Sequence, residues 1–292
     1  MAHIQACLRA LRLHHHVKNG FIWLPIVFGH RLLDAQAALK TGYAFLCFCL
    51  IASSVYILND IIDIAEDRLH PEKRRRPLAS GEISLVNAWI MLCLLLAVSL
   101  GLSVFFLSFS FLYLILFYFF LNLAYSCCLK TFAIMDVVCI AIGFVVRIFA
   151  GGLAANVAIS HWIVMMTFLL ALFLALAKRR DDLLISETAG ANIRKSLQGY
   201  NLDFLSHGIT IMASVIIVAY ILYTVSPEIV ERHGHHPFYL SAAWVILGIL
   251  RYLQGMFVFQ KSGSPVRVLL TDHVLQLIII GWLIHFLILL YP

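Results

Sequence analysis

The chain has 292 residues, of which 62% are hydrophobic and only 12% carry a charge, and its formal net charge is +6. A soluble domain has roughly 25% charged residues, so too few polar side chains remain here to cover a globular surface. The composition therefore excludes an ordinary soluble protein and predicts an all-α, polytopic membrane protein. Nucleic-acid binding is not expected, because the basic residues stand in short segments between apolar runs.

The apolar runs predict the elements in chain order. Residues 1–18 are basic and amphipathic, and we expect this segment to lie at the membrane surface. About nine membrane spans follow, judged against the roughly 20 apolar residues that a helix needs to cross. They cover about residues 19–33, 41–59, 85–106, 108–125, 132–152, 161–177, 207–225, 238–257 and 274–290. We expect one integral membrane domain over residues 1–292, forming a helical bundle.

Three longer polar segments separate the spans, at about residues 60–84, 178–206 and 258–273. If the N-terminus is cytoplasmic, 16 of the 21 lysines and arginines fall on the cytoplasmic side and 3 on the other. Because basic residues favour the cytoplasmic side, this orientation is predicted. Charge then gathers at cytoplasmic helix ends and not at the midplane, which favours an enzyme over a transporter with alternating access.

The second predicted span ends in the sequence NDIIDIAED, residues 59–67. Asn59, Asp63 and Asp67 are spaced i, i+4 and i+8, so they point the same way on a helix. Oxygen-bearing side chains suit a hard cation such as Mg²⁺, and Lys73 and Arg76 follow as groups that bind phosphate. The pattern predicts a Mg²⁺–diphosphate site. Its alternative is that the acids are solvated or pair with the arginines that follow.

Two further clusters stand at predicted cytoplasmic helix ends. Tyr125, Lys130 and Asp136 lie around a short turn, and Arg147 lies about three turns into the next span. An intramembrane arginine indicates either function or structural pairing, and both readings stay open. The second cluster follows the sixth span and contains Lys178, Arg179, Asp182, Glu187, Arg194, Lys195 and Tyr200. Its alternative is a basic membrane anchor with incidental acids.

Other residues predict packing in place of chemistry. Gly151 and Gly152 predict close helix packing or a helix break. The seven cysteines stand mostly in apolar runs, which predicts buried free thiols. For Asp272 and His273 we expect a surface role.

The motif Asn59-Asp60-x-x-Asp63-x-x-x-Asp67 at the end of a second span, together with a second acidic segment after the sixth, resembles the UbiA superfamily of intramembrane prenyltransferases. The resemblance extends to its decaprenyl-phosphate phosphoribosyltransferase branch and covers nearly the whole chain. It is carried by residues 17–19 (VKN), 59–77 (NDIIDIAEDRLHPEKRRRP), 147–152 (RIFAGG), 193–197 (IRKSL) and 272–277 (DHVLQL), with Lys178, Arg179, Asp182 and Tyr200.

This resemblance implies transfer of a 5-phosphoribosyl group from phosphoribosyl diphosphate to a polyprenyl phosphate, for cell-envelope glycan precursors at a bacterial inner membrane. Mg²⁺ is the implied cofactor, with Asn59, Asp63 and Asp67 as ligands. The implied catalytic residues are Asp60, Asp63, Asp67, Lys130 and Arg147. The implied substrate-binding residues are Lys18, Lys73, Arg76, Tyr125, Lys178, Arg179, Asp182, Glu187, Arg194, Lys195 and Tyr200.

Two other functions stay open at this point. One keeps the fold but transfers a prenyl group from a prenyl diphosphate to an aromatic acceptor. The other is a transporter or binding protein for a lipid phosphate. The surplus of cations around the acidic motif favours two phosphorylated substrates. Whether the chain forms a homo-oligomer also stays open.

Overall fold

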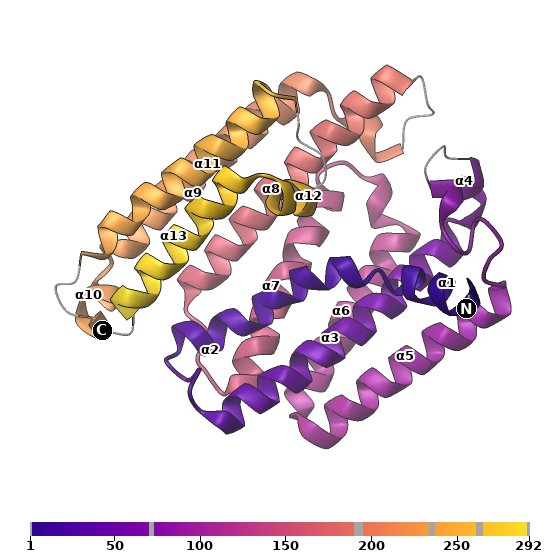
Figure 1. Cartoon of the computed structure of the whole chain (residues 1–292), viewed down its shortest axis with the longest axis horizontal. Helices are drawn as coiled ribbons and strands as arrows, with labels where there is room; N and C mark the ends of the chain where they lie inside the picture. Colours follow the sequence, from indigo (N-terminus) through magenta and orange to yellow (C-terminus); the bar gives the residue numbers. More distant parts are fainter. Residues whose placement is uncertain (1, 70–72, 190–194, 234–236, 261–264, 291–292) are drawn as a thin grey trace. The chain divides into compact units, whose positions relative to one another are not determined.

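The computed structural model describes residues 2–69, 73–189, 195–233, 237–260 and 265–290. In these ranges all regular structure is helical (Figure 1), which confirms the prediction of an all-α fold. The chain divides into two compact units. Unit 1 comprises Met1–Lys130 and Gly143–Ile159, and unit 2 comprises Thr131–Ile142 and Ser160–Pro292. The single domain expected over residues 1–292 stays a prediction.

Unit 1 is built around one long helix, α3 (Ala35–Ile62), which contacts α1, η1, α5 and α6. Its other elements, where η marks a 3₁₀ helix, are α1 (Ala2–Leu11), η1 (Leu13–Trp23), α2 (Leu24–Phe28), α4 (Ile64–Leu69), η2 (Lys73–Arg75), α5 (Leu85–Phe106) and α6 (Phe109–Cys127). After η3 (Leu129–Thr131) comes α7 (Met135–Ala155), whose residues from Gly143 onward belong to unit 1.

Unit 2 contains the first two turns of α7 and the remaining helices. These are α8 (His161–Ala189), η4 (Lys195–Gly199), α9 (Leu202–Thr224), α10 (Pro227–His233), η5 (Phe238–Ser241), α11 (Ala242–Phe257), α12 (Pro265–Thr271) and α13 (His273–Leu290). Helix α9 packs against α8 and α11, and α11 packs against α13. The three helices α9, α11 and α13 run side by side in Figure 1.

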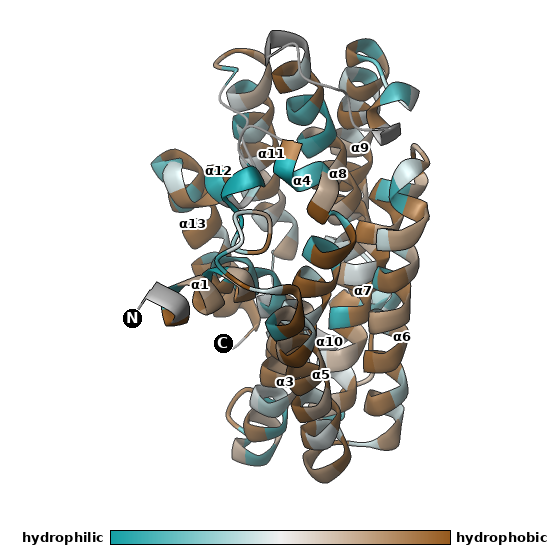
Figure 2. Cartoon of the chain, turned by 90° about the vertical axis from the view of Figure 1, so that its right-hand side faces the viewer, coloured by the Kyte–Doolittle hydropathy of each residue, from teal (hydrophilic) through white to brown (hydrophobic). Residues whose placement is uncertain are grey.

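Eight helices of the described residues are long and apolar enough to cross a membrane. Long helices such as α6 and α13 are brown along most of their length in Figure 2. Large apolar side chains face outward, as with Phe105 at 82% exposure, and lipid is the environment that accepts them. The chain is therefore a multi-pass membrane protein.

The first predicted span, residues 19–33, contains two short helices in place of one long helix. Here η1 ends at Trp23, and α2 covers only five residues with Pro25 in its first turn. Proline is accepted in the first turn of a helix, where its missing N–H group would have no partner. It is not accepted further along, because its ring would clash with the preceding turn. A five-residue helix is far shorter than the roughly 20 residues that a span requires.

Several helices begin earlier than their hydropathy predicts, because polar residues cap them. Asp34 accepts hydrogen bonds from the backbone N–H groups of Gln36 and Ala37, at 3.0 and 3.1 Å, so α3 starts at Ala35 and not near residue 41. Asn201 caps α9 in the same way, which starts at Leu202 and not near residue 207. Such caps satisfy N–H groups that have no partner inside the helix.

The three polar segments contain more helix than predicted. Helix α8 continues to Ala189, twelve residues beyond the span predicted to end at residue 177, so the first part of segment 178–206 is helical. Segment 60–84 contains α4 and η2, and segment 258–273 contains α12. Long charged side chains are good helix formers, so α8 continues after its apolar part ends.

Unit 1 is held by close contact between helices with small side chains. Helices α3 and α5 lie side by side (Figure 1). Ser99 of α5 donates to the backbone carbonyl of Cys47 in α3 at 2.9 Å, and both residues are fully buried. Small residues let helix backbones approach, and hydroxyl groups bond across the contact, where burial of apolar surface gives little driving force in lipid.

Gly151 marks the tightest contact of α7. A Cβ atom at this position would lie 2.1 Å from the carbonyl oxygen of Ile22 in η1, which confirms the predicted close packing. We expect Gly151→Ala to destabilise the protein by about 1–3 kcal/mol, because the backbone of η1 must move. Gly143→Ala is the matched control on α7, since its Cβ would meet its nearest atom at 3.7 Å. Thermal unfolding in detergent measures both, and equal stabilities would contradict the prediction.

Candidate active site

The acidic motif lies where α3 gives way to α4. Helix α3 ends at Ile62, Asp63 is its C-terminal cap, and α4 begins at Ile64, so the motif is not on one unbroken helix as predicted. The helical hydrogen bonds nevertheless continue across the break. The Asp63 N–H donates to the Asn59 carbonyl at 2.9 Å, and the Asp67 N–H donates to the Asp63 carbonyl at 2.8 Å. The i, i+4, i+8 spacing therefore keeps its structural meaning.

Each of the three carboxylates in the motif contacts a cationic side chain. Lys130 pairs with Asp63. Arg76 donates through Nη1 to Asp67 at 2.6 Å and to Asp60 at 3.1 Å. Arg12 donates through Nη2 to the same oxygen of Asp60, Oδ1. The acids are buried, and burying a charge in a membrane protein is costly unless it is paired.

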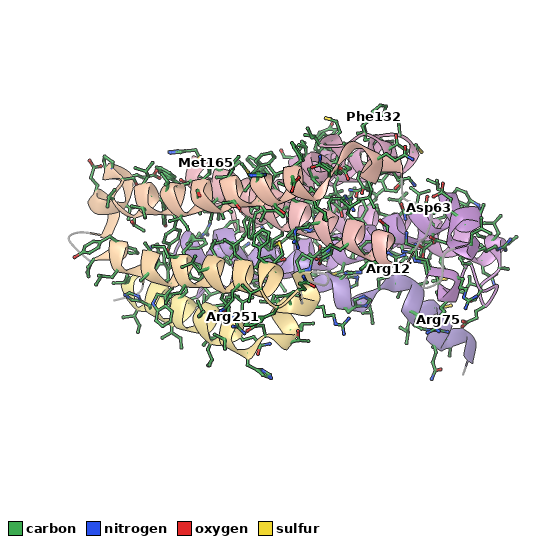
Figure 3. The ribbon with its side chains drawn as sticks, turned by 90° about the horizontal axis from the view of Figure 1, so that it is seen from above. Arg12, Asp63, Arg75, Phe132, Met165 and Arg251 are labelled. Atoms are coloured by element: carbon green, nitrogen blue, oxygen red, sulfur yellow. The ribbon has the colours of Figure 1, made fainter. Side chains whose placement is uncertain are left out.

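These cations come from distant parts of the sequence. Of these three cations, only Arg76 belongs to the arginines that follow the motif. The alternative that the acids pair with those arginines therefore holds for Arg76. Arg12 is 48 residues from Asp60, and Lys130 is 67 residues from Asp63. Both Arg12 and Asp63 belong to unit 1, and Figure 3 labels them. Burial lowers the pKa of Arg12, Asp60 opposes that shift, and Arg76 adds to it.

The donor set suits a hard divalent cation in its chemistry. Asn59, Asp63 and Asp67 offer only oxygen ligands, which Mg²⁺ prefers. Asn59 is oriented by two hydrogen bonds, accepting from Ser126 at 3.2 Å and donating to Asp63 at 3.1 Å. In the described part of the chain, no three His, Cys, Asp or Glu side chains gather around one point. Metal binding would therefore require Lys130 and Arg76 to share these oxygens or to move.

The other predicted residues of unit 1 lie on several elements. Lys18 is half-buried in η1, Lys73 is half-buried in η2, and Tyr125 is half-buried near the end of α6. Their contact with substrate stays a prediction.

Arg147 lies inside the helix packing of unit 1 and is 5% exposed. Its Nε donates to Asn19 at 2.8 Å, its Nη1 to the Gly143 carbonyl at 2.7 Å, and its Nη2 to the Tyr118 hydroxyl at 3.0 Å. The rings of Phe48, Tyr118 and Phe144 surround the guanidinium at 4.9–5.7 Å. Among the described residues, the hydrogen-bond partners of Arg147 are neutral groups and not a carboxylate. These bonds join η1 to α7, and a catalytic role for Arg147 stays a prediction.

The second predicted cluster lies in unit 2 and centres on a residue outside the predicted site. Asp136 is fully buried and accepts hydrogen bonds from Arg179 Nε at 2.5 Å and from the Tyr200 hydroxyl at 2.7 Å. The Tyr200 oxygen also accepts from the backbone N–H of Ile134 at 2.6 Å. Burial raises the pKa of Tyr200, and its bond to Asp136 adds to that shift, so the hydroxyl remains a donor. This network joins α7 and α8 to Tyr200, which directly follows η4.

That network contains two of the predicted substrate-binding residues. Arg179 is 2% exposed and Tyr200 is 7% exposed, and their contact with substrate stays a prediction. Asp182 keeps a 31% exposed side chain while it accepts from Arg179 at 2.9 Å, and Lys178 is exposed. Arg194 lies outside the described residues, as do the side chains of Glu187 and Lys195.

Sequence reasoning missed Arg12 and Ser126 in these two networks, and it left Asp136 outside the predicted site. Arg12 had been counted only as a basic residue that sets topology, and nothing in its local sequence marks it as a partner of Asp60. Ser126 gives no signal, because serine is common in membrane helices. Asp136 did stand out as a carboxylate at the start of a span, a position where such a group needs a partner.

The fold and the acidic motif define a class: an all-helical, multi-pass membrane protein with an aspartate-rich site at a helix end. Residues 22–194 match the UbiA prenyltransferase family. Decaprenyl-phosphate phosphoribosyltransferase of Corynebacterium glutamicum is 32% identical over 94% of this chain and 83% of its own length. The protein of that description from Mycolicibacterium smegmatis is 33% identical over 85% of this chain and 80% of its own length.

Solved structures agree in fold. A UbiA homolog from Archaeoglobus fulgidus, bound to DMAPP and Mg²⁺, superposes with a TM-score of 0.71 at 19% identity and covers 94% of this chain and 96% of its own. The chain belongs to the UbiA prenyltransferase family, which confirms the resemblance seen in the sequence.

Proposed function

We propose that this protein transfers a 5-phosphoribosyl group from phosphoribosyl diphosphate to a polyprenyl phosphate and releases diphosphate. The observation that carries the proposal is the arrangement of cations around the motif. Arg12, Arg76 and Lys130 converge on buried carboxylates from three separate segments. A prenyl diphosphate brings only one phosphorylated group to such a site, whereas the proposed donor and acceptor bring three. The relatives described as decaprenyl-phosphate phosphoribosyltransferases support the same choice.

In the proposed reaction the bond from ribose C1 to the diphosphate oxygen breaks, and a bond from C1 to a phosphate oxygen of the lipid forms on the opposite face. Asn59, Asp63 and Asp67 would hold Mg²⁺, whose chemistry when bound is to neutralise the departing diphosphate. Lys130, adjacent to Asp63, would contact the leaving oxygens. The attacking phosphate is already anionic, so positioning and charge neutralisation carry the catalysis without a strong general base.

Further parts of the proposal concern the membrane. We place the N-terminus and the active site on the cytoplasmic side of a bacterial inner membrane, because 16 of the 21 basic residues then lie on that side. The donor is water-soluble and would arrive from that side. The polyprenyl tail would lie among apolar helices. Lys178 and Asp182 in unit 2 stay candidates for substrate contact, since both are accessible.

Purified protein in nanodiscs tests the proposal with ribose-labelled phosphoribosyl diphosphate, Mg²⁺ and polyprenyl phosphate. We expect label in the lipid phase, and none when EDTA replaces Mg²⁺. A parallel reaction contains a prenyl diphosphate and an aromatic acid. Product only in that reaction would favour the prenyltransferase. Uptake of lipid phosphate without product in either reaction would favour a transporter or binding protein.

A further inference from the structure

Arg12 is held in an unusual backbone conformation at the junction of α1 and η1. Its φ of 51° and ψ of 50° lie in the left-handed region, which is strained for a residue with a side chain. Contacts on both sides maintain it. Ser53 of α3 donates to the carbonyl of Leu11 at 3.0 Å, and the Arg12 guanidinium lies 5.1 Å from the centre of the Tyr56 ring. The junction therefore directs Arg12 to the end of α3.

Asp60 brings Arg12 together with Arg76. Both guanidinium groups donate to Oδ1 of Asp60, which is 4% exposed, while the arginine side chains are 18% and 25% exposed. Arg76 also contacts Asp67, so two carboxylates balance the two guanidinium groups. The two arginines lie together at an accessible edge of the buried acids.

Both arginines keep unused donors. Among the described residues, the side chain of Arg12 donates hydrogen bonds only through Nη2 and that of Arg76 only through Nη1. The Nε–H of each, and further N–H groups, have no acceptor in that part of the protein. A guanidinium presents these groups as a planar fork that matches two oxygens of a phosphate.

We propose that Arg12 and Arg76, gathered by Asp60, bind the 5-phosphate of the phosphoribosyl donor. This inference rests on the proposed function. The donor carries a diphosphate on C1 and a separate phosphate on C5, and the oxygens of Asn59, Asp63 and Asp67 are assigned to the diphosphate. Arg76 contacts Asp67, so the arginine pair adjoins that motif without being part of it.

This pair selects against a prenyl diphosphate, which has no second phosphate to fill it. It also explains the tethering of the N-terminal segment to α3. Lys130 reaches Asp63 from η3, at the end of a membrane helix, whereas Arg12 and Arg76 come from segments outside the spans. A soluble sugar phosphate would approach from the aqueous side, where these segments lie.

The test compares Arg12→Gln and Arg12→Lys with Arg9→Gln. Arg9 is the matched control, because it lies on α1 and pairs with Glu82 through a 54% exposed side chain. Thermal stabilisation by ribose 5-phosphate and by pyrophosphate is measured without acceptor, and KM and kcat are measured in the transfer assay. For Arg12→Gln we expect ribose 5-phosphate affinity to fall about 10-fold or more and the donor KM to rise similarly.

In Arg12→Gln, the pyrophosphate affinity and the KM for the lipid should stay within about twofold of the wild-type values. The ribose 5-phosphate affinity of Arg12→Lys should lie between those of Arg12→Gln and the wild type. Arg9→Gln should match the wild type. Equal weakening of pyrophosphate, a change confined to the lipid KM, or no change would overturn the inference. If Arg12→Gln does not fold, Arg12→Lys is judged by the same comparison. Wild-type protein that makes no labelled lipid refutes the proposed function, whereas normal wild-type transfer with unchanged ribose 5-phosphate affinity refutes only this inference.

Discussion

Asp63→Asn should lower the turnover number for phosphoribosyl transfer by roughly 100- to 1,000-fold, because it removes one charged ligand at the place where leaving-group charge develops. Asp63 is the central residue of the motif. It receives Lys130 and the Asn59 amide, and its backbone continues the hydrogen bonding from α3 into α4. The amide keeps the shape of the side chain but supplies no negative charge for a metal ion or for Lys130. Steady-state transfer of labelled ribose phosphate measures the effect.

Glu66→Gln is the matched control for this substitution, since Glu66 lies three residues further on in α4 and is exposed. It should leave turnover near the wild-type value. Size-exclusion profiles and thermal unfolding must show that Asp63→Asn remains folded. Near-normal turnover in a folded Asp63→Asn protein would refute the metal assignment.

Asp136→Asn should lower the free energy of unfolding by about 3–5 kcal/mol, because it removes the fully buried charged partner of Arg179 and leaves only the partly exposed carboxylate of Asp182 beside that guanidinium. Asp136 and Arg179 are 0% and 2% exposed, and Tyr200 completes the network. Asp182→Asn is the matched control, because Asp182 contacts the same arginine from a 31% exposed position. It should cost at most about 1 kcal/mol. Denaturant titration in mixed micelles gives both values.

A double variant separates pairing from packing. Asp136→Leu with Arg179→Met removes both charges, and replacing a buried pair by apolar side chains is often near neutral. We therefore expect the double variant to lose less stability than the sum of the losses in Asp136→Leu alone and Arg179→Met alone. Additive losses, or a single-variant loss below about 1 kcal/mol, would show that the pair is not the basis of this contact.

The sequence predicted most of the fold because membrane spans leave a strong signal. Runs of apolar residues fixed α5 at Leu85–Phe106 and placed the other long helices to within several residues. It failed where local polar groups decide a boundary. Asp34 and Asn201 extend helices at their starts, and the charged turns after Ala177 continue α8 as a helix. Pro25 does the opposite, since it confines α2 to five residues.

By itself, the sequence determined the fold class, the family and the acidic motif, because hydropathy and the spacing of Asn59, Asp63 and Asp67 are local properties of the chain. The tertiary structure decided which cations meet those acids. Arg12 and Lys130 reach Asp60 and Asp63 only because distant segments pack against the end of α3. It also decided which groups surround Arg147 and Arg179, since burial and the partner atoms of a side chain depend on the packing of several helices at once.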